Sequence, residues 1–468
     1  MRFLVLGWLV LSAALLVRAE PVDRIEADRR AKDAFLKLNF FAEGDGMHMS
    51  PDLVNLTGQK DRLGVADTYR HRWGLNLDAN EQPIGFFREK WKQMDIGVMG
   101  CVVCHSGRAA GIFVPGLGNK NIDVLQLGRD VLKTETAWKK WTDVWVRKDA
   151  EYHRVENAAL SFASFLAQEP KGNLTQGMVP VAMIRDWFFR IENVPYPAGT
   201  PRGAVKVPSL WGYGEKRKVG QFCDGLGDGS LPGWAVAVEL VGGQRPEVVR
   251  AYRPKIDQAE GVLADFLPPK YPFGYDPIAA ITGNRLFARN CAGCHGTYQN
   301  DSAVLPIYEA PKWVAWETVR TDRDRIDGNS PLFRSLVDRS PLNDLIKQTA
   351  LPDGYLASRL VGIWARFPYL HHGGVPSIAA LLTPPARRPR VWSLRDAGER
   401  TRFDAENLGL TVPAPGSKEE AVLLKKGRAG DRDVYLSERV GHSSQGHDFH
   451  TDLAPDEKHA LIEYLKSL

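Results

Sequence analysis

Two segments of the chain combine cysteine and histidine in one spacing, Cys-x-x-Cys-His. Two thiols three residues apart lie about one helical turn from each other, where they can add to the two vinyl groups of a haem. The imidazole of the next residue can then bind the iron as its proximal ligand. A redox cysteine pair or half of a zinc site would not explain a histidine directly after both pairs. We therefore expect two covalently bound haem c groups, haem 1 on Cys101, Cys104 and His105, and haem 2 on Cys291, Cys294 and His295.

The sixth ligand of haem 2 cannot be a methionine from the same part of the chain. The seven methionines end at Met183, so none follows His295. A second histidine lowers the reduction potential of a haem iron relative to an axial methionine, and we expect a low-potential haem with two histidine ligands. His459 falls off the apolar face of the terminal helix and is set aside. The remaining candidates form two clusters, His371 and His372 in one, and His442, His447 and His450 in the other.

For haem 1 no pattern selects a sixth ligand. The candidates in its part of the chain are Met47, His48, Met49, His71, His153, Met178 and Met183. An open sixth position lets iron react with peroxide or dioxygen, whereas two strong protein ligands restrict a haem to electron transfer. We expect an open haem 1 that carries out chemistry beside a haem 2 that relays electrons. The alternative is a non-catalytic electron carrier in which both haems are six-coordinate.

The elements expected around the second motif are helices. Residues 276–290 are compatible with a helix that follows Pro277 and contains the small Gly283. The last segment, residues 455–468, has the periodicity of an amphipathic helix. Its apolar face comprises Ala460, Leu461, Tyr464, Leu465 and Leu468. A helix with a small glycine before Cys-x-x-Cys-His, crossed by a terminal helix with an aromatic and leucine face, resembles the cytochrome c fold.

The approach to the first motif is less regular. We expect one helix over residues 86–94 and a closing helix over residues 156–168, which Pro170 ends. Several prolines punctuate the chain between the motifs, and we place a domain boundary near residues 255–275. The sequence thus predicts an all-α protein with two cytochrome c-like domains, residues 20–265 and 266–468, each with long loop insertions and one covalent haem.

The first 19 residues have the pattern of a secretory signal peptide. Arg2 supplies a positive charge before an apolar run from Phe3 to Val17, and cleavage is expected after Ala19. This run is short for a membrane anchor, and no later stretch predicts a membrane-spanning helix. The 61 basic and 56 acidic residues give a formal charge of only +5, without the basic run of a nucleic-acid binder. We expect a bacterial protein that is periplasmic or secreted and is not integral to a membrane after cleavage.

Residues 367–383, FPYLHHGGVPSIAALLT, resemble a Pro-Tyr-Phe/Leu-His-Asp/Asn-Gly segment of bacterial di-haem cytochrome c peroxidases and their relatives. The similarity is closer to the rubber-oxygenase-like branch of that superfamily. The segments that carry it are Cys-His-Ser-Gly at 104–107, Asp-Gly-Leu-Gly at 224–227, Pro-Pro-Lys-Tyr-Pro at 268–272, Cys-His-Gly-Thr-Tyr at 294–298 and the terminal GHDFHTDLAPDEKHALIEYLKSL. The resemblance covers most of residues 95–468.

This resemblance implies His105 and His295 as proximal ligands, His447 as the sixth ligand of haem 2, and an open or dioxygen-binding haem 1. His371 and His372 remain alternatives to His447. Two departures from the family pattern limit which family properties can be carried over to this chain. Where the peroxidases carry an axial methionine this chain has a proline, and the chain is shorter than rubber oxygenases, so their substrate does not carry over.

The similar region of these enzymes also supplies aromatic residues between the haems. We expect Trp211, in Val-Pro-Ser-Leu-Trp, to relay electrons or to line the haem 1 pocket, and a plain core tryptophan is the simpler alternative. Cys223 is left over and is expected to be a buried, inert thiol, with intermolecular pairing as the alternative. The segment Asp224–Ser230 suggests a calcium site, which the peroxidase relatives have, although a polar turn explains it better. The basic stretch Pro384–Arg390 is expected to be a solvated turn, or else to approach haem propionates or a partner.

These residues predict a periplasmic di-haem c-type cytochrome, an oxidoreductase in which haem 2 transfers electrons and haem 1 reduces peroxide or activates dioxygen. Its partners would be small redox proteins as electron donor or acceptor, together with peroxide, dioxygen or an unsaturated organic substrate. No nucleic-acid partner is expected. No carboxylate has a spacing tied to haem 1, so no general acid or base is assigned.

Overall fold

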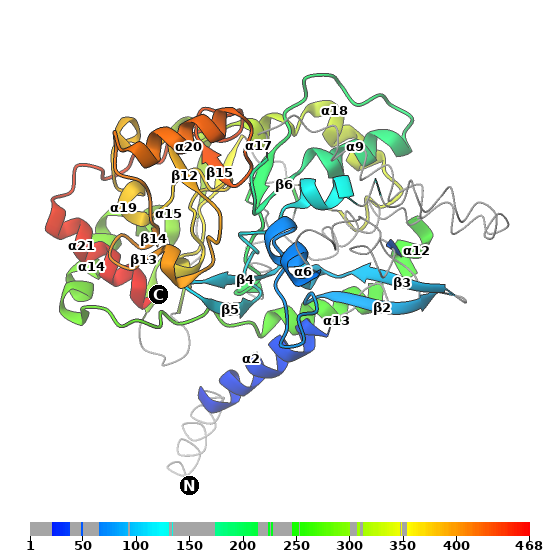
Figure 1. Ribbon diagram of the computed structural model, residues 1–468, viewed down its shortest axis with the longest axis horizontal. Helices are drawn as coiled ribbons and strands as arrows, with labels where there is room; N and C mark the ends of the chain where they lie inside the picture. The colour runs from blue at the N-terminus through cyan, green and yellow to red at the C-terminus, as the bar shows by residue number, and fades with distance from the viewer. Residues whose placement is uncertain are drawn as a thin grey trace, which may run out of the picture.

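Short helices and short strands alternate along the chain in a computed structural model (Figure 1). The structure describes residues 21–37, 48–49, 65–91, 94–130, 133, 174–213, 223–224, 226–227, 246–251, 253–299, 307–308, 312–346, 348 and 353–468. The expected signal peptide and the expected helix over residues 156–168 lie outside these ranges. Within them, no helix combines the length and the apolar character that crossing a bilayer requires.

The helices of the described part are mostly shorter than four turns. The α-helices are α2 Pro21–Leu36, α5 Val65–Asp67, α6 Cys101–Cys104, α9 Ala182–Ile191, α12 Pro246–Ala251, α13 Arg253–Ala264, α14 Pro277–Asn290, α15 Ala292–His295, α16 Trp316–Val319, α17 Asp324–Asp327, α18 Pro331–Arg339, α19 Ile378–Leu381, α20 Lys418–Arg428 and α21 Pro455–Ser467. A π-helical turn, η1, spans Thr68–Arg72, and 3-10 turns span η2 Ile363–Ala365, η3 Pro385–Arg387 and η4 Arg400–Arg402.

The two helices expected around the second motif are confirmed as α14 and α21, which cross at one end of the molecule (Figure 1). Asp276 caps α14, because its Oδ1 accepts hydrogen bonds from the backbone N–H groups of Ile278 and Ala279. A Cβ atom on Gly283 would lie 2.0 Å from the carbonyl oxygen of Ala460, so only glycine permits this close crossing. All five residues of the predicted apolar face of α21 are buried.

The expectation of an all-α protein is wrong. Helix makes up 42% and strand 13% of the structure, so the fold is mixed. The described strands form one three-stranded sheet, β1–β3–β2, and six antiparallel pairs, β4–β5, β6–β7, β8–β9, β10–β11, β12–β15 and β13–β14. Their bounds are β1 His48–Met49, β2 Phe86–Trp91, β3 Met94–Met99, β4 Ser106–Ala109, β5 Ile112–Pro115, β6 Met178–Pro180, β7 Ala204–Lys206, β8 Tyr298–Gln299, β9 Ile307–Tyr308, β10 Trp313–Ala315, β11 Gly354–Leu356, β12 Val391–Ser393, β13 Phe403–Asp404, β14 Gly409–Leu410 and β15 Val434–Leu436.

The helix expected over residues 86–94 is a second error, because this segment is a β-hairpin. β2 pairs with β3 over its whole length, from Phe86 opposite Met99 to Trp91 opposite Met94. The charged residues of this segment are good helix formers, which favoured the helical interpretation. Its aromatic residues and the β-branched residues of β3 fit a pleated surface, and the partner strand supplies the backbone hydrogen bonds.

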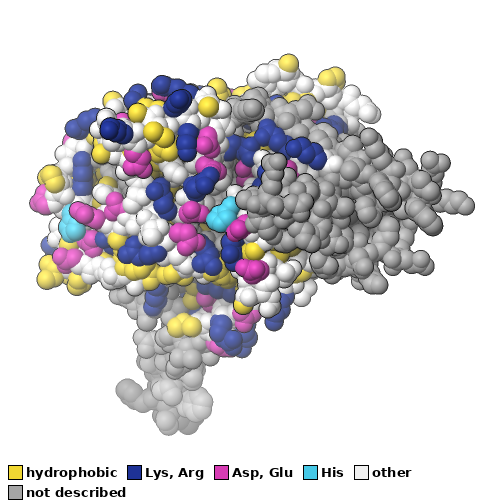
Figure 2. Space-filling model, viewed as in Figure 1, with side chains coloured by type: hydrophobic (Ala, Val, Ile, Leu, Met, Phe, Trp, Pro, Cys, Tyr) yellow, Lys and Arg dark blue, Asp and Glu magenta, His cyan; other side chains and the backbone are white. Residues whose placement is uncertain are grey.

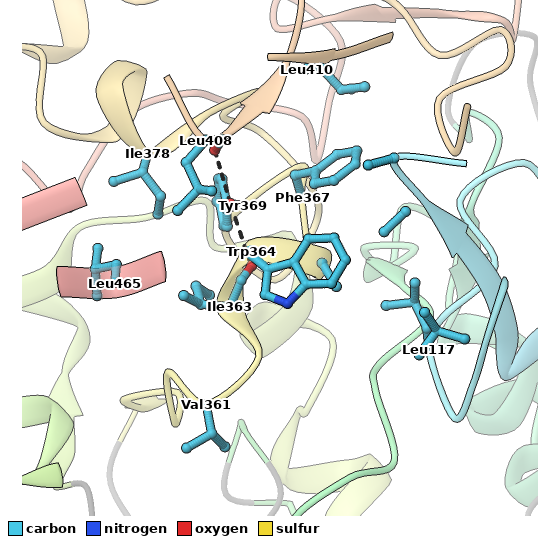
Figure 3. Packing of buried hydrophobic residues seen from close by; sticks show 14 of the residues in the cluster. Leu117, Val361, Ile363, Trp364, Phe367, Tyr369, Ile378, Leu408, Leu410 and Leu465 are labelled. Carbon is cyan, nitrogen blue, oxygen red and sulfur yellow. Dashed lines mark hydrogen bonds between the residues drawn. The ribbon is translucent and has the colours of Figure 1, made fainter. Parts of the chain in front are cut away.

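One hydrophobic cluster joins residues from both sides of the predicted domain boundary. Leu117 from the N-terminal part and Trp364, Phe367 and Leu465 from the C-terminal part lie in the same packed region (Figure 3). The buried hydroxyl group of Tyr369 donates a hydrogen bond of 3.0 Å to the carbonyl oxygen of Leu408 in its centre (Figure 3). The two Cys-x-x-Cys-His motifs are thus set on elements that share a core.

Candidate haem sites

The second motif begins where α14 ends. The Cys291 N–H bonds the carbonyl oxygen of Phe287, and the short helix α15 then carries the chain to His295. The Nδ1 atom of His295 lies 2.8 Å from the carbonyl oxygen of Ser358. A carbonyl only accepts, so this contact places the proton on Nδ1 and leaves the Nε2 lone pair for a metal. The arrangement fits a proximal haem ligand that is held in one tautomer.

His447 faces His295 at a distance that suits an iron ion between them. The centroids of the two rings are 6.1 Å apart and the ring planes are inclined at 50°. Two metal–imidazole bonds of about 2 Å, each extended by roughly 1 Å from the ring nitrogen to the ring centre, add up to about 6 Å. Direct stacking of two rings would bring the centroids closer than this. The separation therefore suits two imidazoles that would hold one metal ion between them.

Both imidazoles are held in the neutral form that binds metal. Burial lowers the pKa of His295. Burial, and then the neighbouring His295, lower the pKa of His447 to about 4. At neutral pH neither ring has to lose a proton before it coordinates iron.

A buried arginine holds the loop that carries His447. The guanidinium group of Arg388 donates hydrogen bonds to the carbonyl oxygens of Ser444, Gly446 and His447, at 2.6, 2.7 and 2.9 Å. The same group also bonds the carbonyl oxygens of Leu381 and Thr383, at 3.1 and 3.0 Å. Arg388 belongs to the basic stretch that was expected to be a solvated turn, and for this residue the expectation is wrong. The exposed neighbour Arg387 does fit it.

The other histidine candidates for haem 2 have different partners. His372 places Nε2 2.7 Å from the carbonyl oxygen of Ser443, and His450 places Nε2 3.0 Å from that of Asn290. His442 bonds through Nδ1 to the carbonyl oxygen of Val440, and its ring packs on Tyr435. His371 stacks on Tyr355 with ring centroids 4.7 Å apart. Of the histidines in the two clusters, His447 is the one whose ring faces His295.

The first motif forms α6, and the chain turns from it into the β4–β5 hairpin. The Nδ1 atom of His105 lies 2.9 Å from the carbonyl oxygen of Pro208, which repeats the environment of His295. Backbone bonds from Gly116 to the His105 carbonyl and from Asn119 to the Cys104 carbonyl hold the turn in place. Burial raises the pKa of Cys104 to about 12, so it is a thiol at neutral pH.

The structure narrows the candidates for the sixth ligand of haem 1 without selecting one. His71 is exposed and lies 3.8 Å from Asp67, so it is a surface residue. Met178 is buried, and its sulfur accepts a hydrogen bond from the hydroxyl group of Thr175. Met183 lies on α9. Met47 and His153 are outside the described residues, and only the backbone of His48 and Met49 is described.

Trp211 lies on a short connection between His105 and His295. It follows Pro208 by three residues, and its Nε1–H donates a 3.0 Å hydrogen bond to the carbonyl oxygen of Val361. Val361 in turn follows Ser358 by three residues. A covalent and hydrogen-bonded route thus runs from His105 through Pro208, Trp211, Val361 and Ser358 to His295. Trp211 is buried, as a core tryptophan would also be.

Two further sequence expectations meet different outcomes. Cys223 is exposed, so the expectation of a buried thiol is wrong. The carboxylate of Asp224 pairs with Arg325 at 2.9 Å and accepts bonds from Asn329 and from the Leu226 N–H. These contacts engage both carboxylate oxygens, which favours the structural interpretation over a calcium ligand for this residue. Most of the remaining Asp224–Ser230 segment lies outside the described residues.

Sequence reasoning did not identify Ser358, Pro208 or Arg388 as site residues. The two carbonyl groups are backbone atoms, which leave no mark on side-chain patterns. The Arg388 clamp joins residues far apart in the chain, and its basic neighbours made it look like part of a surface turn.

Comparison with known proteins gives a local match and two partial relatives. Residues 354–393 match the family described as RoxA-like, cytochrome c-like. The uncharacterized protein y4iM of Sinorhizobium fredii is 30% identical over 285 residues, which cover 55% of this chain and 60% of that protein. The uncharacterized protein y4iJ of the same organism is 38% identical over 284 residues, 47% of this chain and 45% of that protein. The chain therefore spans only about half the length of the curated relatives it matches.

The family match falls on a segment that contacts His295 and the loop of His447. It contains Ser358, Val361 and Arg388, each of which contributes a contact described above. The match and these contacts support a haem-binding cytochrome c of the RoxA-like branch.

Proposed function

We propose that this protein is an exported di-haem c-type cytochrome that works as an oxidoreductase. In this proposal Cys291, Cys294 and His295 hold haem 2, with His447 as the second axial ligand, and Cys101, Cys104 and His105 hold haem 1. The observation that carries the proposal is the opposition of His295 and His447 at 6.1 Å directly after a Cys-x-x-Cys-His motif.

When bound, haem iron supplies one-electron redox chemistry and, where a coordination position is open, reaction with peroxide or dioxygen. The protein contributes by holding each proximal imidazole with a backbone carbonyl, which makes the ring a stronger electron donor and prevents it from rotating. Two histidine ligands make the second site suited to electron transfer at low potential. Trp211 connects the two sites through the Val361 carbonyl and is the residue proposed to relay electrons.

The finer part of the proposal is that haem 1 reduces peroxide or activates dioxygen, with an unsaturated organic compound as a candidate substrate in the second case. The resemblance of residues 367–383 to the peroxidase and rubber-oxygenase-like segments supports it. The partners would be small redox proteins in the bacterial periplasm. Basic and acidic side chains are interspersed over the described part of the visible face (Figure 2). Such a surface suits brief encounters with a partner more than strong electrostatic attraction.

The test is a spectroscopic one on the purified, fully matured protein. Pyridine haemochrome analysis and mass spectrometry count the haems, and absorption and EPR spectra of the oxidised and the dithionite-reduced, carbon monoxide-treated forms report coordination. Two haems per chain, with one low-spin site and one that binds carbon monoxide, are the expected result. Two low-spin haems that do not bind carbon monoxide would make the protein an electron carrier and overturn the catalytic part. Fewer than two haems would overturn the proposal itself.

A further inference from the structure

Three cations, the buried Lys120 and the partly buried Lys206 and Arg366, lie between the two candidate haem sites. Lys120 donates a 3.0 Å hydrogen bond to the carbonyl oxygen of Arg108, on the strand that follows His105. Lys206, two residues before Pro208, donates bonds of 2.6 and 2.5 Å to the carbonyl oxygens of Arg366 and Pro368. The charges of Lys120 and Lys206 repel each other, and so do those of Lys206 and Arg366. The charge of Arg366 also reaches His295 and contributes to lowering its pKa.

No carboxylate of the described residues balances these charges. The nearest charged groups that act on Lys120 and on Lys206 are other cations, and those that act on Arg366 are two tyrosines and an arginine. Burial lowers the pKa of Lys206 to about 7 and that of Arg366 to about 10. An isolated buried charge costs several kcal/mol in free energy, which is why buried cations in proteins normally have anionic partners.

Several other buried or partly buried cations of the described residues follow that rule, whereas Arg185 and Arg388 bond carbonyl and amide oxygens instead. Arg325 pairs with Asp224 at 2.9 Å, Lys466 with Glu463 at 2.5 Å and Arg432 with Asp123 at 2.5 Å. The row of Lys120, Lys206 and Arg366 differs from these pairs, because neighbouring cations in it repel each other and no carboxylate of the described residues offsets them. The row lies between His105 and His295, where the two proposed haems would bring their anionic propionates.

Each of the three cations has donor capacity left. An ammonium group has three N–H bonds, and Lys206 uses two of them on carbonyl oxygens. Lys120 has one carbonyl partner and lies 4.5 Å from the centre of the Phe367 ring. Arg366 donates through Nη2 to the carbonyl oxygen of Arg359, while its Nε lacks a partner among the described residues.

We propose that Lys120, Lys206 and Arg366 bind the propionate carboxylates of the two haems, the lysines on the side of His105 and the arginine on the side of His295. Haem carries two propionates, so two haems bring four carboxylates into the region. A propionate beside each cation restores the charge balance and takes up the remaining N–H groups. The row then contributes to the redox properties, because a buried cation keeps the propionate ionised and favours the reduced, less positive iron. This inference rests on the proposed function, since it requires both haems.

The test compares Lys206→Met with Lys425→Met in the matured protein. Lys425 is an exposed lysine on α20 and serves as the matched control. The readouts are the number of haems per chain and the midpoint potential of each haem between pH 6 and pH 8. Lys206→Met should retain two haems, lower one midpoint potential at pH 8 and change the pH dependence of that potential relative to the wild type, because the propionate that has lost its cation can then take up a proton. Lys425→Met should match the wild type.

Unchanged potentials in Lys206→Met across this pH range would overturn the inference while leaving two haems and the proposed function intact. If Lys206→Met does not acquire its haems, a crystal structure of the wild-type holoprotein tests the inference instead. A propionate oxygen within hydrogen-bond distance of Lys206, Lys120 or Arg366 is expected, and its absence at all three would overturn the inference. A wild type with fewer than two haems would instead contradict the proposed function.

Discussion

The histidines near the second haem site show how backbone contacts divide roles among residues of one type. His372 and His450 engage Nε2 with a backbone carbonyl oxygen, which occupies the nitrogen that axial ligands commonly use. His447 is partly buried and faces another imidazole across a gap of the right size for a metal ion. Residue type and spacing do not select one of these histidines as the ligand. The contacts of each ring with the surrounding backbone distinguish them.

His447→Ala tests the ligand directly. The variant should keep two covalent haems but convert haem 2 from a low-spin to a five-coordinate site, because the opposing imidazole is lost. The absorption spectrum and EPR should lose one low-spin signal, and carbon monoxide should bind one more site per chain than in the wild type. His450→Ala removes a ring that is bonded to the Asn290 carbonyl and is the control. It should keep the low-spin signal of haem 2 and bind no additional carbon monoxide. A low-spin spectrum retained in His447→Ala would assign the ligand to another residue.

His442 makes stability depend on pH. Burial lowers its pKa to about 3, so the folded protein keeps this ring neutral where the unfolded chain, with a pKa near the ordinary value of about 6.5, binds a proton. The stabilisation is therefore present above about pH 6.5 and is lost as the pH falls toward about 3, at up to about 1.4 kcal/mol per pH unit. Urea unfolding measures the free energy of unfolding at pH 7 and at pH 4.5. The difference between these two values should be smaller for His442→Gln than for the wild type. An equal difference in both proteins would show that this ring does not contribute.

At the scale of elements, the crossing of α14 and α21 depends on one glycine. Gly283→Ala places a methyl group 2.0 Å from the Ala460 carbonyl oxygen, a backbone atom that cannot rotate away. Overpacking of this kind should lower the free energy of unfolding by about 2–3 kcal/mol. The control is Gly261→Ala on α13, where an added Cβ has no neighbour within 4 Å. That change should stabilise the protein by about 0.5–1 kcal/mol, because alanine is the better helix former. Thermal unfolding of the two variants measures both effects, and equal effects would argue against a close helix crossing.

The Arg388 clamp should link the stability of the loop to the coordination of haem 2. Arg388→Met leaves several buried carbonyl groups without a donor, and we expect a loss of roughly 3 kcal/mol in unfolding free energy. Part of the haem 2 population should also change from low spin to high spin, since the loop that presents His447 is no longer held. Arg387→Met changes the exposed neighbour and should alter neither quantity. A destabilised Arg388→Met protein with an unchanged haem spectrum would show that Arg388 stabilises the fold but does not position His447.

Elements with strong local signals could be predicted from the sequence, and those that depend on distant partners could not. Asp276, Pro277 and the apolar face of residues 455–468 are local, and they gave both helices correctly. Residues 86–94 contain strong helix formers, yet pairing with the following strand makes them a hairpin. The haem attachment residues were identified from one short motif, whereas the Ser358 and Pro208 carbonyl groups depend on the three-dimensional arrangement of the chain.

At the scale of the whole molecule, the route through Trp211 predicts how the two sites communicate. Trp211→Phe keeps an aromatic ring but removes the Nε1–H bond to the Val361 carbonyl. The variant should retain two haems with unchanged spectra and should transfer electrons between them more slowly, by roughly tenfold if the hydrogen bond contributes about 1.4 kcal/mol to the barrier. Flash photolysis of the half-reduced, carbon monoxide-bound protein would measure the rate. An unchanged rate of electron transfer between the haems would show that Trp211 is a core residue without a role in this transfer.

The segment 358–371 touches both sites, because Ser358 bonds His295, Val361 bonds Trp211 and the His371 carbonyl accepts from the backbone of Lys206. It also follows both cysteine pairs in the chain. A ribosome makes a protein from its N-terminus, so both pairs leave it before the segment that packs between them exists. Both thiol pairs thus precede this segment in the chain, and they are accessible for haem attachment until the segment has packed between them.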